Sequence, residues 1–336
     1  MLAGGGHTHA LMLLRWAKHP HTRPKGLITL INRDSTTIYS AMVPGVISGE
    51  YSLEDAQIDL RKLAHSAGVV LVIAEIIGLN ADKKILYLEN RPNVQFSRIS
   101  IDVGSETNTE IQNYEYESKD VAIPIKPFEK AIKWIESHDF ESCSKSGKTF
   151  SVVGSGLAGV EIIFALRKRW PNRFLQLQVD SSKPKKKLKK ALENANIHLV
   201  DRETLLSGPI LLCTGSKSIN WLKKSGLDID NSGRVMTLPT LQSINYPYIF
   251  SVGDCGVISK FSRPPSGVWA VRAAKPLARN IERHSKELNL FHWKPQKSAL
   301  QLLGGPFNLN MSLGWAFWGK FSIGPHPIFW FLKQLI

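Results

Sequence analysis

A glycine-rich segment near the middle of the chain limits the possible folds more than any other feature. Apolar residues 149–153 predict a strand, and residues 154–159, with the sequence GSGLAG, have glycine at the three positions of a G-x-G-x-x-G turn. Residues 162–170 show a helical apolar pattern, and residues 174–180 predict the next strand. Such a turn lets a pyrophosphate approach the N–H groups of a helix N-terminus. The segment therefore predicts a dinucleotide-binding βαβ unit.

The glycines and the acid of this unit are candidate ligands of a nicotinamide nucleotide: Gly154, Gly156, Gly159 and Asp180. The acid follows the turn by about 20 residues, where a carboxylate commonly binds the ribose hydroxyls of NAD. Residues 181–183, with the sequence SSK, come next and could receive the 2′-phosphate of NADPH instead. We therefore expect NAD(P)H as a cofactor, with NADH slightly preferred.

A second glycine turn opens the chain and consists of Gly4, Gly5 and Gly6. A helical pattern over residues 11–17 and a strand over residues 26–31 follow it, so this segment also reads as a βαβ unit. His9 stands where a third small residue is usual, and Asn32 stands where an acid usually binds the ribose. The residues before the turn are too few for a full strand, so we expect the native protein to begin further upstream.

Three short apolar runs elsewhere in the chain are each followed by glycine and one or two further residues. Residues 99–105 and 210–216 end in Gly-Ser, and residues 245–255 end in Gly253-Asp254-Cys255. With the two glycine turns, this order resembles the pyridine nucleotide–disulfide oxidoreductase superfamily, especially its type II NADH dehydrogenases. The likeness is closer still to the flavoproteins fused or linked to selenide, water dikinase. The segments that carry this closer likeness are residues 4–9, 39–45, 51–52, 58–60 and 265–272.

The resemblance implies an α/β fold with two Rossmann-like dinucleotide-binding domains and a small C-terminal cap. It assigns an FAD-binding domain to residues 1–120 and 217–290, an inserted and compressed NAD(P)-binding domain to residues 121–216, and the cap to residues 291–336. It assigns FAD contacts to Gly4, Gly5, Gly6, His7, Asn32, Met42, Pro44, Gly104, Gly253, Asp254, Gly267 and Val268. It assigns NAD(P)H contacts to Gly154, Gly156, Gly159, Glu161, Asp180 and Gly215.

The cysteines and the shortened second domain bear on which function within the superfamily we expect. Disulfide reductases of this superfamily use two closely spaced cysteines, whereas Cys143, Cys213 and Cys255 are far apart in the sequence. We therefore expect an FAD-dependent NAD(P)H oxidoreductase without a redox-active disulfide, passing electrons to a small quinone-like or selenium-linked acceptor. No catalytic side chain is assigned. The alternative is a flavin-binding accessory module of a selenide, water dikinase partner with little or no turnover, which the compressed domain favours.

The composition bears on partners and location. The formal net charge is +15, yet no nucleic-acid-binding signature is present, so we expect no nucleic-acid partner. His7 and His9 lack further ligands in register, so we predict no metal site. An odd number of widely spaced cysteines is typical of a reducing compartment, so we expect the cytoplasm. The lysine-rich residues 183–190 read as a solvated helix face, with anion or membrane binding as the alternative.

The aromatic residues near the C-terminus allow two interpretations. Residues 313–332 are rich in Trp and Phe, and glycines and prolines interrupt them, so they do not form a membrane span. They pack against the body of the protein or against a following domain, or else residues 313–336 contact the inner face of a membrane peripherally, with Lys320 and Lys333 at the headgroups.

Overall fold

The computed structural model describes residues 1–109, 122–140, 149–179, 186–261, 263–296, 300–308, 311–318 and 321–334. Contacts divide the chain into two compact units. The first unit comprises Met1–Tyr39, Gln57–Glu106 and Lys217–Gln296. The second unit comprises Ser40–Ala56, Thr107–Ser216 and Lys297–Ile336. The short strands β10 (Glu106–Thr107) and β16 (Ser216–Lys217) lie where the chain passes from one unit to the other.

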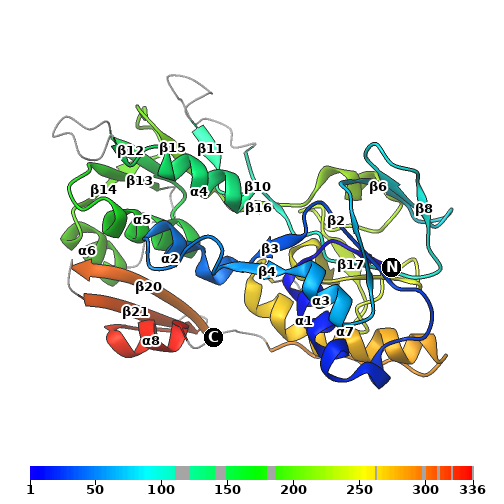
Figure 1. Ribbon diagram of the computed structural model, residues 1–336. Helices are drawn as coiled ribbons and strands as arrows, with labels where there is room; N and C mark the ends of the chain where they lie inside the picture. The colour runs from blue at the N-terminus through cyan, green and yellow to red at the C-terminus, as the bar shows by residue number, and fades with distance from the viewer. Residues whose placement is uncertain are drawn as a thin grey trace. The chain divides into compact units, whose positions relative to one another are not determined.

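A parallel five-stranded sheet, in the order β18-β9-β1-β2-β5, forms the centre of the first unit (Figure 1). Its strands are β1 (Leu2–Ala3), β2 (Thr29–Asn32), β5 (Val70–Ile73), β9 (Ile99–Ile101) and β18 (Ile249–Ser251). The glycine turn leads from β1 into α1 (His7–Lys18), which ends before Pro20 because proline cannot continue a helix. Helix α1 then returns the chain to β2, which pairs parallel with β1. The predicted first βαβ unit is therefore present.

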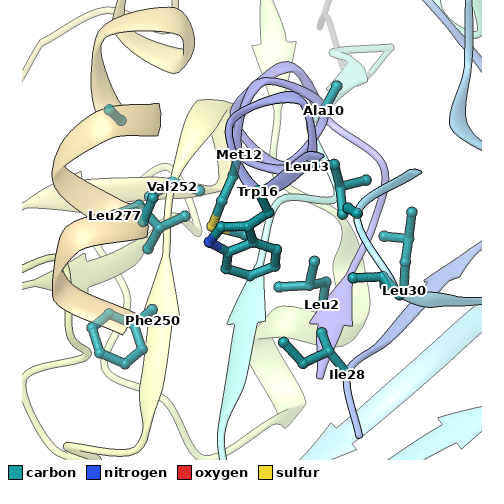
Figure 2. Packing of buried hydrophobic residues seen from close by; sticks show 14 of the residues in the cluster. Leu2, Ala10, Met12, Leu13, Trp16, Ile28, Leu30, Phe250, Val252 and Leu277 are labelled. Carbon is teal, nitrogen blue, oxygen red and sulfur yellow. The ribbon is translucent and has the colours of Figure 1, made fainter. Parts of the chain in front are cut away.

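One face of α1 is buried in the core of this unit. Met12, Leu13 and Trp16 recur at helical spacing and are at most 1% exposed. Figure 2 shows the Trp16 ring between Leu277 of α7 (Gly267–Ser285) and Leu2 of the sheet. Burial of this apolar face holds α1 against the sheet and α7.

Smaller elements surround the first sheet. A three-stranded antiparallel sheet, β6 (Ile76–Asn80), β7 (Ile85–Leu88) and β8 (Val94–Gln95), lies in the chain between β5 and β9. The pairs β3 (Thr36–Ile38) with β4 (Gln57–Asp59) and β17 (Val235–Thr237) with β19 (Gly256–Ile258) form two further sheets. Helix α3 (Leu60–Ser66) begins at Asp59, whose carboxylate accepts the Lys62 N–H as an N-cap. The short helices are η1 (Pro20–Thr22), η5 (Asn220–Lys224) and η6 (Gly253–Cys255).

The second unit repeats this plan with a parallel sheet in the order β11-β15-β12-β13-β14. Its strands are β11 (Ala122–Pro124), β12 (Phe150–Val153), β13 (Leu175–Val179), β14 (Ile197–Asp201) and β15 (Ile210–Leu212). Helix α5 (Leu157–Arg169) connects β12 to β13, and α6 (Lys186–Asn194) precedes β14. Only residues 202–209 separate β14 from β15, where the first unit has three extra strands. The second βαβ unit and its compression are as the sequence predicts.

Two segments outside this sheet belong to the second unit. The first contains η2 (Ser40–Met42) and α2 (Val43–Ile47), and α2 packs on α5 and α4 (Phe128–Glu136). The second is an antiparallel sheet of β20 (Leu300–Asn308), β21 (Met311–Trp318) and β22 (Phe321–His326), followed by α8 (Pro327–Gln334). The predicted domain ranges place residues 40–56 with the FAD domain and residues 291–336 in a separate cap, whereas contacts place residues 40–56 and 297–336 in the second unit.

The C-terminal aromatic residues divide into a buried and an exposed group. Trp315 and Phe317 are buried, and the Trp315 ring lies 6.1 Å from that of Phe164 on α5. Figure 1 shows β20 beside α5 within this unit, with β21 next to β20. Trp318 and Phe321, in contrast, are 62% and 79% exposed. Over the described ranges, none of the helices combines the length and apolarity that crossing a bilayer requires.

Candidate functional site

The first glycine turn excludes side chains at all three of its positions. Gly4 has φ +88°, and a Cβ there would lie 2.5 Å from the Asp102 carbonyl oxygen. A Cβ on Gly5 would meet a methyl group of Leu60, and one on Gly6 would lie 2.5 Å from both carboxylate oxygens of Asp102. Real Cβ atoms do not approach other atoms so closely. The backbone here therefore lies close to other groups, as a dinucleotide-binding turn requires.

Asp102, the residue after β9, holds the start of α1 in place. Its carbonyl oxygen accepts the Gly6 N–H at 3.1 Å, and its Oδ2 accepts the His9 N–H at 3.0 Å. Gly6 is the N-cap residue and supplies no side-chain cap, so Asp102 caps the helix from a distant part of the chain. A carboxylate at a helix N-terminus is favourable, by about 0.3–1 kcal/mol at exposed sites.

The environment of the Asp102 carboxyl group disfavours its ionised form. The residue is 2% exposed, and this burial raises its pKa to about 6. The His9 N–H and the neighbouring His7 lower the pKa, and the charge of Asp254 raises it. Burial has the largest effect, so a proton binds this group more tightly than it binds an exposed aspartate.

His9 is a structural residue of the turn rather than a ligand. It is fully buried, with Nδ1 2.7 Å from the Gly4 carbonyl oxygen and Nε2 2.8 Å from the Ser100 hydroxyl. Because a carbonyl only accepts hydrogen bonds, Nδ1 carries the proton and Nε2 accepts from Ser100. Burial lowers the pKa of His9 to about 4, so the ring is neutral at pH 7. His9 braces the turn at the position where a small residue is usual.

The Gly253-Asp254 turn meets the first glycine turn at the same carboxylate. A Cβ on Gly253, which has φ +67°, would collide with Oδ1 of Asp102, the atom that also excludes a Cβ on Gly6. Beside it, the Ser105 hydroxyl donates to Oδ2 of Asp254 at 2.8 Å. The structure thus brings together two segments that the sequence predicts to contact a common ligand.

The start of α7 joins this group through α1. The Thr8 hydroxyl donates to the Ala270 carbonyl oxygen at 2.9 Å, within the first turns of both helices. Gly267 and Val268 therefore lie at the N-terminus of a helix tied to the first turn of α1. Gly104 has φ +74°, and a Cβ there would have no neighbour within 4 Å, which leaves room beside it.

Four other predicted FAD contacts have different surroundings. The side chain of Asn32 is turned back onto the glycine turn, because Oδ1 accepts the Gly5 N–H at 2.9 Å and Nδ2 donates to the Asp34 carbonyl oxygen at 2.8 Å. The ring of His7 lies 5.3 Å from that of Tyr39. Met42 and Pro44 belong to the second unit, in η2 and α2, so their place at the flavin stays a prediction.

The second glycine turn combines two tight positions with one open position. A Cβ on Gly154 would collide with the Cys213 carbonyl oxygen, and one on Gly159 would collide with the Gly154 carbonyl oxygen. Gly156 is the N-cap residue of α5, and a Cβ there would have no neighbour within 4 Å, so there is space beside this helix N-terminus. A helix N-terminus with space beside it is a favourable place for an anion.

Cys213 occupies the position in the second unit that Asp102 occupies in the first. Each follows a parallel strand, and each donates its N–H at 2.8 Å to the strand before the glycine turn, Cys213 to Val153 and Asp102 to Ala3. Burial raises the pKa of the Cys213 thiol to about 12, so this residue is neutral. The two turns therefore differ in charge although their backbones match.

The remaining predicted NAD(P)H contacts lie at various points of the second unit. Oε1 of Glu161 accepts the Gly304 N–H of β20 at 3.2 Å, which attaches the C-terminal sheet to α5. Gly215 has φ +91° and open space beside it. Asp180 lies outside the described residues. Among the residues with described positions, no group of three or more His, Cys, Asp or Glu could hold a metal ion.

Sequence reasoning missed Asp102 as a site residue. A signal was available in the internal repeat of the chain, because residues 101–105, IDVGS, align with residues 212–216, LCTGS. Aligning the two segments places an acid in one unit where the other unit has a cysteine. A charged residue at the end of a buried parallel strand is unusual enough to mark a functional position.

The first unit has the features that FAD binding requires. Glycines that exclude side chains surround the N-terminus of α1, and Asp254 with Ser105 supplies polar groups suited to the hydroxyls of a ribityl chain. The second unit has an open helix N-terminus suited to the pyrophosphate of a nicotinamide nucleotide. Both glycine turns therefore fit dinucleotides.

Comparisons with known proteins agree with this architecture. No family model matches the chain. Ferroptosis suppressor protein 1 of Xenopus tropicalis is 23% identical over 267 residues, which cover 68% of this chain and 67% of that protein. The sulfide:quinone oxidoreductase of Aquifex aeolicus superimposes with a TM-score of 0.76 at 14% identity, covering 99% of this chain and 88% of the other. The water-forming NADH oxidase of Lactobacillus brevis, solved with NADH bound, gives a TM-score of 0.71 at 17% identity and covers 94% and 74%. The chain thus has the two-domain Rossmann-like fold of these redox enzymes.

Proposed function

We propose that this chain is an FAD-dependent NAD(P)H oxidoreductase that passes electrons to a small acceptor without a redox-active disulfide. One observation carries the proposal: Gly6 and Gly253, which are far apart in the sequence, both exclude a side chain because of the same oxygen of Asp102. Together with the space beside the N-terminus of α5, this supports two separate sites for dinucleotides. The oxidoreductase names of proteins with the same fold support this reading.

The residues of the chain hold and orient the two nucleotides. The first glycine turn and Asp254 would hold FAD, and the N-terminus of α5 would receive the pyrophosphate of NAD(P)H. When bound, flavin supplies the chemistry that accepts a hydride and passes electrons on, so the protein needs no acid–base side chain for that step.

The cysteines support electron transfer to a diffusible acceptor. Cys213 and Cys255 are free and buried, and burial raises the pKa of each thiol to about 12. A thiol with so high a pKa is a poor nucleophile in disulfide exchange. Cys143 lies outside the described residues. A quinone-like acceptor is the first candidate, and the sulfide:quinone oxidoreductase of the same fold is consistent with it. A selenium-linked acceptor rests on the sequence resemblance alone.

The absorption spectrum and anaerobic stopped-flow mixing test the proposal. The purified protein should show flavin absorption, and NADH or NADPH should bleach it. Gly156→Asp places a negative charge at the open N-terminus of α5, where it repels a pyrophosphate, so bleaching should slow by at least about tenfold while flavin stays bound. Gly156→Asn is the matched control, because it has nearly the same shape without the charge. Flavin absorption without bleaching by either coenzyme would contradict the oxidoreductase assignment.

The alternative function is a flavin-binding accessory module that serves a selenide, water dikinase partner and turns over weakly. The observation that favours it is the shortened second unit, in which only residues 202–209 connect β14 to β15. Copurification with the dikinase would support this alternative. Rapid bleaching by NADH at rates typical of enzymes would contradict it.

We also propose peripheral membrane contact as a property of the C-terminal segment. Trp318, Phe321 and Ile323 are each more than 60% exposed, which is unusual for large apolar side chains. Trp318→Ser with Phe321→Ser should abolish flotation with anionic liposomes. Thr22→Ala, which changes a side chain of the first unit, is the control. The absence of flotation by the unaltered protein would contradict this contact.

A further inference from the structure

Asp102 excludes side chains from the first glycine turn, and it also brings a carboxyl group that can carry negative charge. A carboxylate lies beside Gly6, whereas a Cβ on the equivalent Gly156 would have no neighbour within 4 Å, and this carboxylate accepts the His9 N–H of α1. This N–H group is one of those that a helix N-terminus offers to a bound phosphate. The first unit therefore already has an internal carboxylate bonded to one of the N–H groups at the N-terminus of α1.

The groups that act on this carboxylate carry charges of both signs. Those that face it are His7 and His9 of α1 and Asp254 and Cys255 of η6. His9 is neutral, because its burial lowers its pKa to about 4. Asp254 adds a second negative charge, and Cys255 is an uncharged thiol. His7 acts in the opposite direction, because its charge lowers the pKa of Asp102.

A bound pyrophosphate would add negative charge to this environment. Like charges at close range favour the protonated form of a carboxyl group, and the effect is strong where water is excluded. We propose that Asp102 takes up a proton when a flavin dinucleotide binds at the first glycine turn, so that flavin affinity depends on pH through this residue. This inference rests on the proposed FAD site. Its physical basis is the buried carboxylate beside Gly6 and Gly253.

Linkage gives the direction and size of the effect. A ligand that favours the protonated form of a group binds more tightly at low pH. Burial raises the pKa of Asp102 in the flavin-free protein to about 6, so protonation becomes a requirement of binding above this pH. The affinity for FAD should then fall by up to about tenfold per pH unit between about pH 6 and pH 8, the limit for one linked proton.

Calorimetric titration of flavin-free protein with FAD measures this proton directly. Titrations at pH 7 in two buffers with different ionisation enthalpies should show uptake of close to one proton per FAD in the unaltered protein. Asp102→Asn keeps an oxygen that can accept the His9 N–H and has no titratable group, so its uptake should be near zero and its affinity independent of pH. Asp102→Ala, which only removes atoms, is the second variant and should behave alike if Asp102→Asn does not fold.

His7→Gln is the control for the other source of protons. It removes the histidine whose charge lowers the pKa of Asp102, so the free protein should already hold more of the proton at pH 7 and uptake should persist at a reduced level. Uptake that survives in both Asp102 variants, or that disappears in His7→Gln, would overturn the inference. FAD binding without any uptake in the unaltered protein would also overturn it. If none of the proteins binds FAD at any pH, the proposed flavin site itself is wrong, which is a separate result.

Discussion

The two glycine turns have nearly the same backbone conformation, but different groups surround them. Gly6 has φ −64° and ψ 171°, and Gly156 has φ −65° and ψ 165°. Both are N-cap residues of helices that follow the first strand of a βαβ unit. A side chain on Gly6 would collide with the Asp102 carboxylate, whereas one on Gly156 would meet nothing. The comparison shows that one residue at the end of a neighbouring strand decides what a dinucleotide turn can accommodate.

The largest expected effects come from the positions where the two turns are alike. Gly4→Ala and Gly154→Ala each place a Cβ at positive φ against a backbone carbonyl group, that of Asp102 or of Cys213. Backbone cannot move aside as a flexible side chain does, so each change should lower the free energy of unfolding by about 3 kcal/mol or more. Chemical denaturation measures the loss. A tolerated alanine at either position would show that the turns are less tightly packed than the structure indicates.

The second-largest expected effect is a difference between the two turns in how stability depends on pH. Burial raises the pKa of Asp102 to about 6, above its value in the unfolded chain, so the folded protein binds more protons between about pH 4 and 6. This contribution to stability is present at low pH and is lost as the pH rises through that window. Asp102→Asn should therefore gain stability relative to the unaltered protein on going from pH 4 to pH 7, by about 2–3 kcal/mol in total.

Cys213→Ser is the matched control at the equivalent position of the second unit. The Cys213 thiol, with a pKa raised to about 12, stays neutral over the whole range, so its replacement should change stability by the same amount at each pH. His9 contributes the opposite slope, because burial lowers its pKa to about 4 and the unfolded chain then binds more protons up to about pH 6.5. Urea unfolding of flavin-free protein at several pH values checks these slopes. Parallel curves for Asp102→Asn and the unaltered protein would contradict the assignment.

A single alanine at each N-cap tests the comparison most directly. Gly6→Ala should destabilise the protein by about 1–3 kcal/mol, because the Asp102 side chain must shift. Gly156→Ala should be neutral or stabilising by about 0.5 kcal/mol, since it restricts the unfolded chain without a clash. Combining Gly6→Ala with Asp102→Ala should recover part of the loss. Equal effects of the two single changes would mean that Asp102 does not fill the first turn.

Periodicity and glycine spacing predicted the two βαβ units because these signals are local. The turn at residues 154–159 and the strands on either side of it appear where expected, and so does the short connection from β14 to β15. The position of Asp102 could not be read in this way, since it depends on which strand pairs with β1 across the sheet. The grouping of α2 with α5 likewise depends on packing between distant segments. The attachment of Glu161 to Gly304 also joins distant segments, and no local pattern encodes it.

The smallest predicted effect concerns capping at the open turn. Gly156→Asp should raise the stability of the protein by a few tenths of a kcal/mol, because aspartate is a better N-cap than glycine and its charge favours the N-terminus of α5. At Gly6 the same substitution should destabilise, because it adds a second carboxylate against Asp102. Thermal unfolding with Gly156→Asn as the uncharged control isolates the contribution of charge. Since salt screens that contribution, the advantage of Gly156→Asp over Gly156→Asn should shrink at high ionic strength. An advantage that is unchanged by salt would place the stabilisation in the hydrogen bond of the cap rather than in the charge.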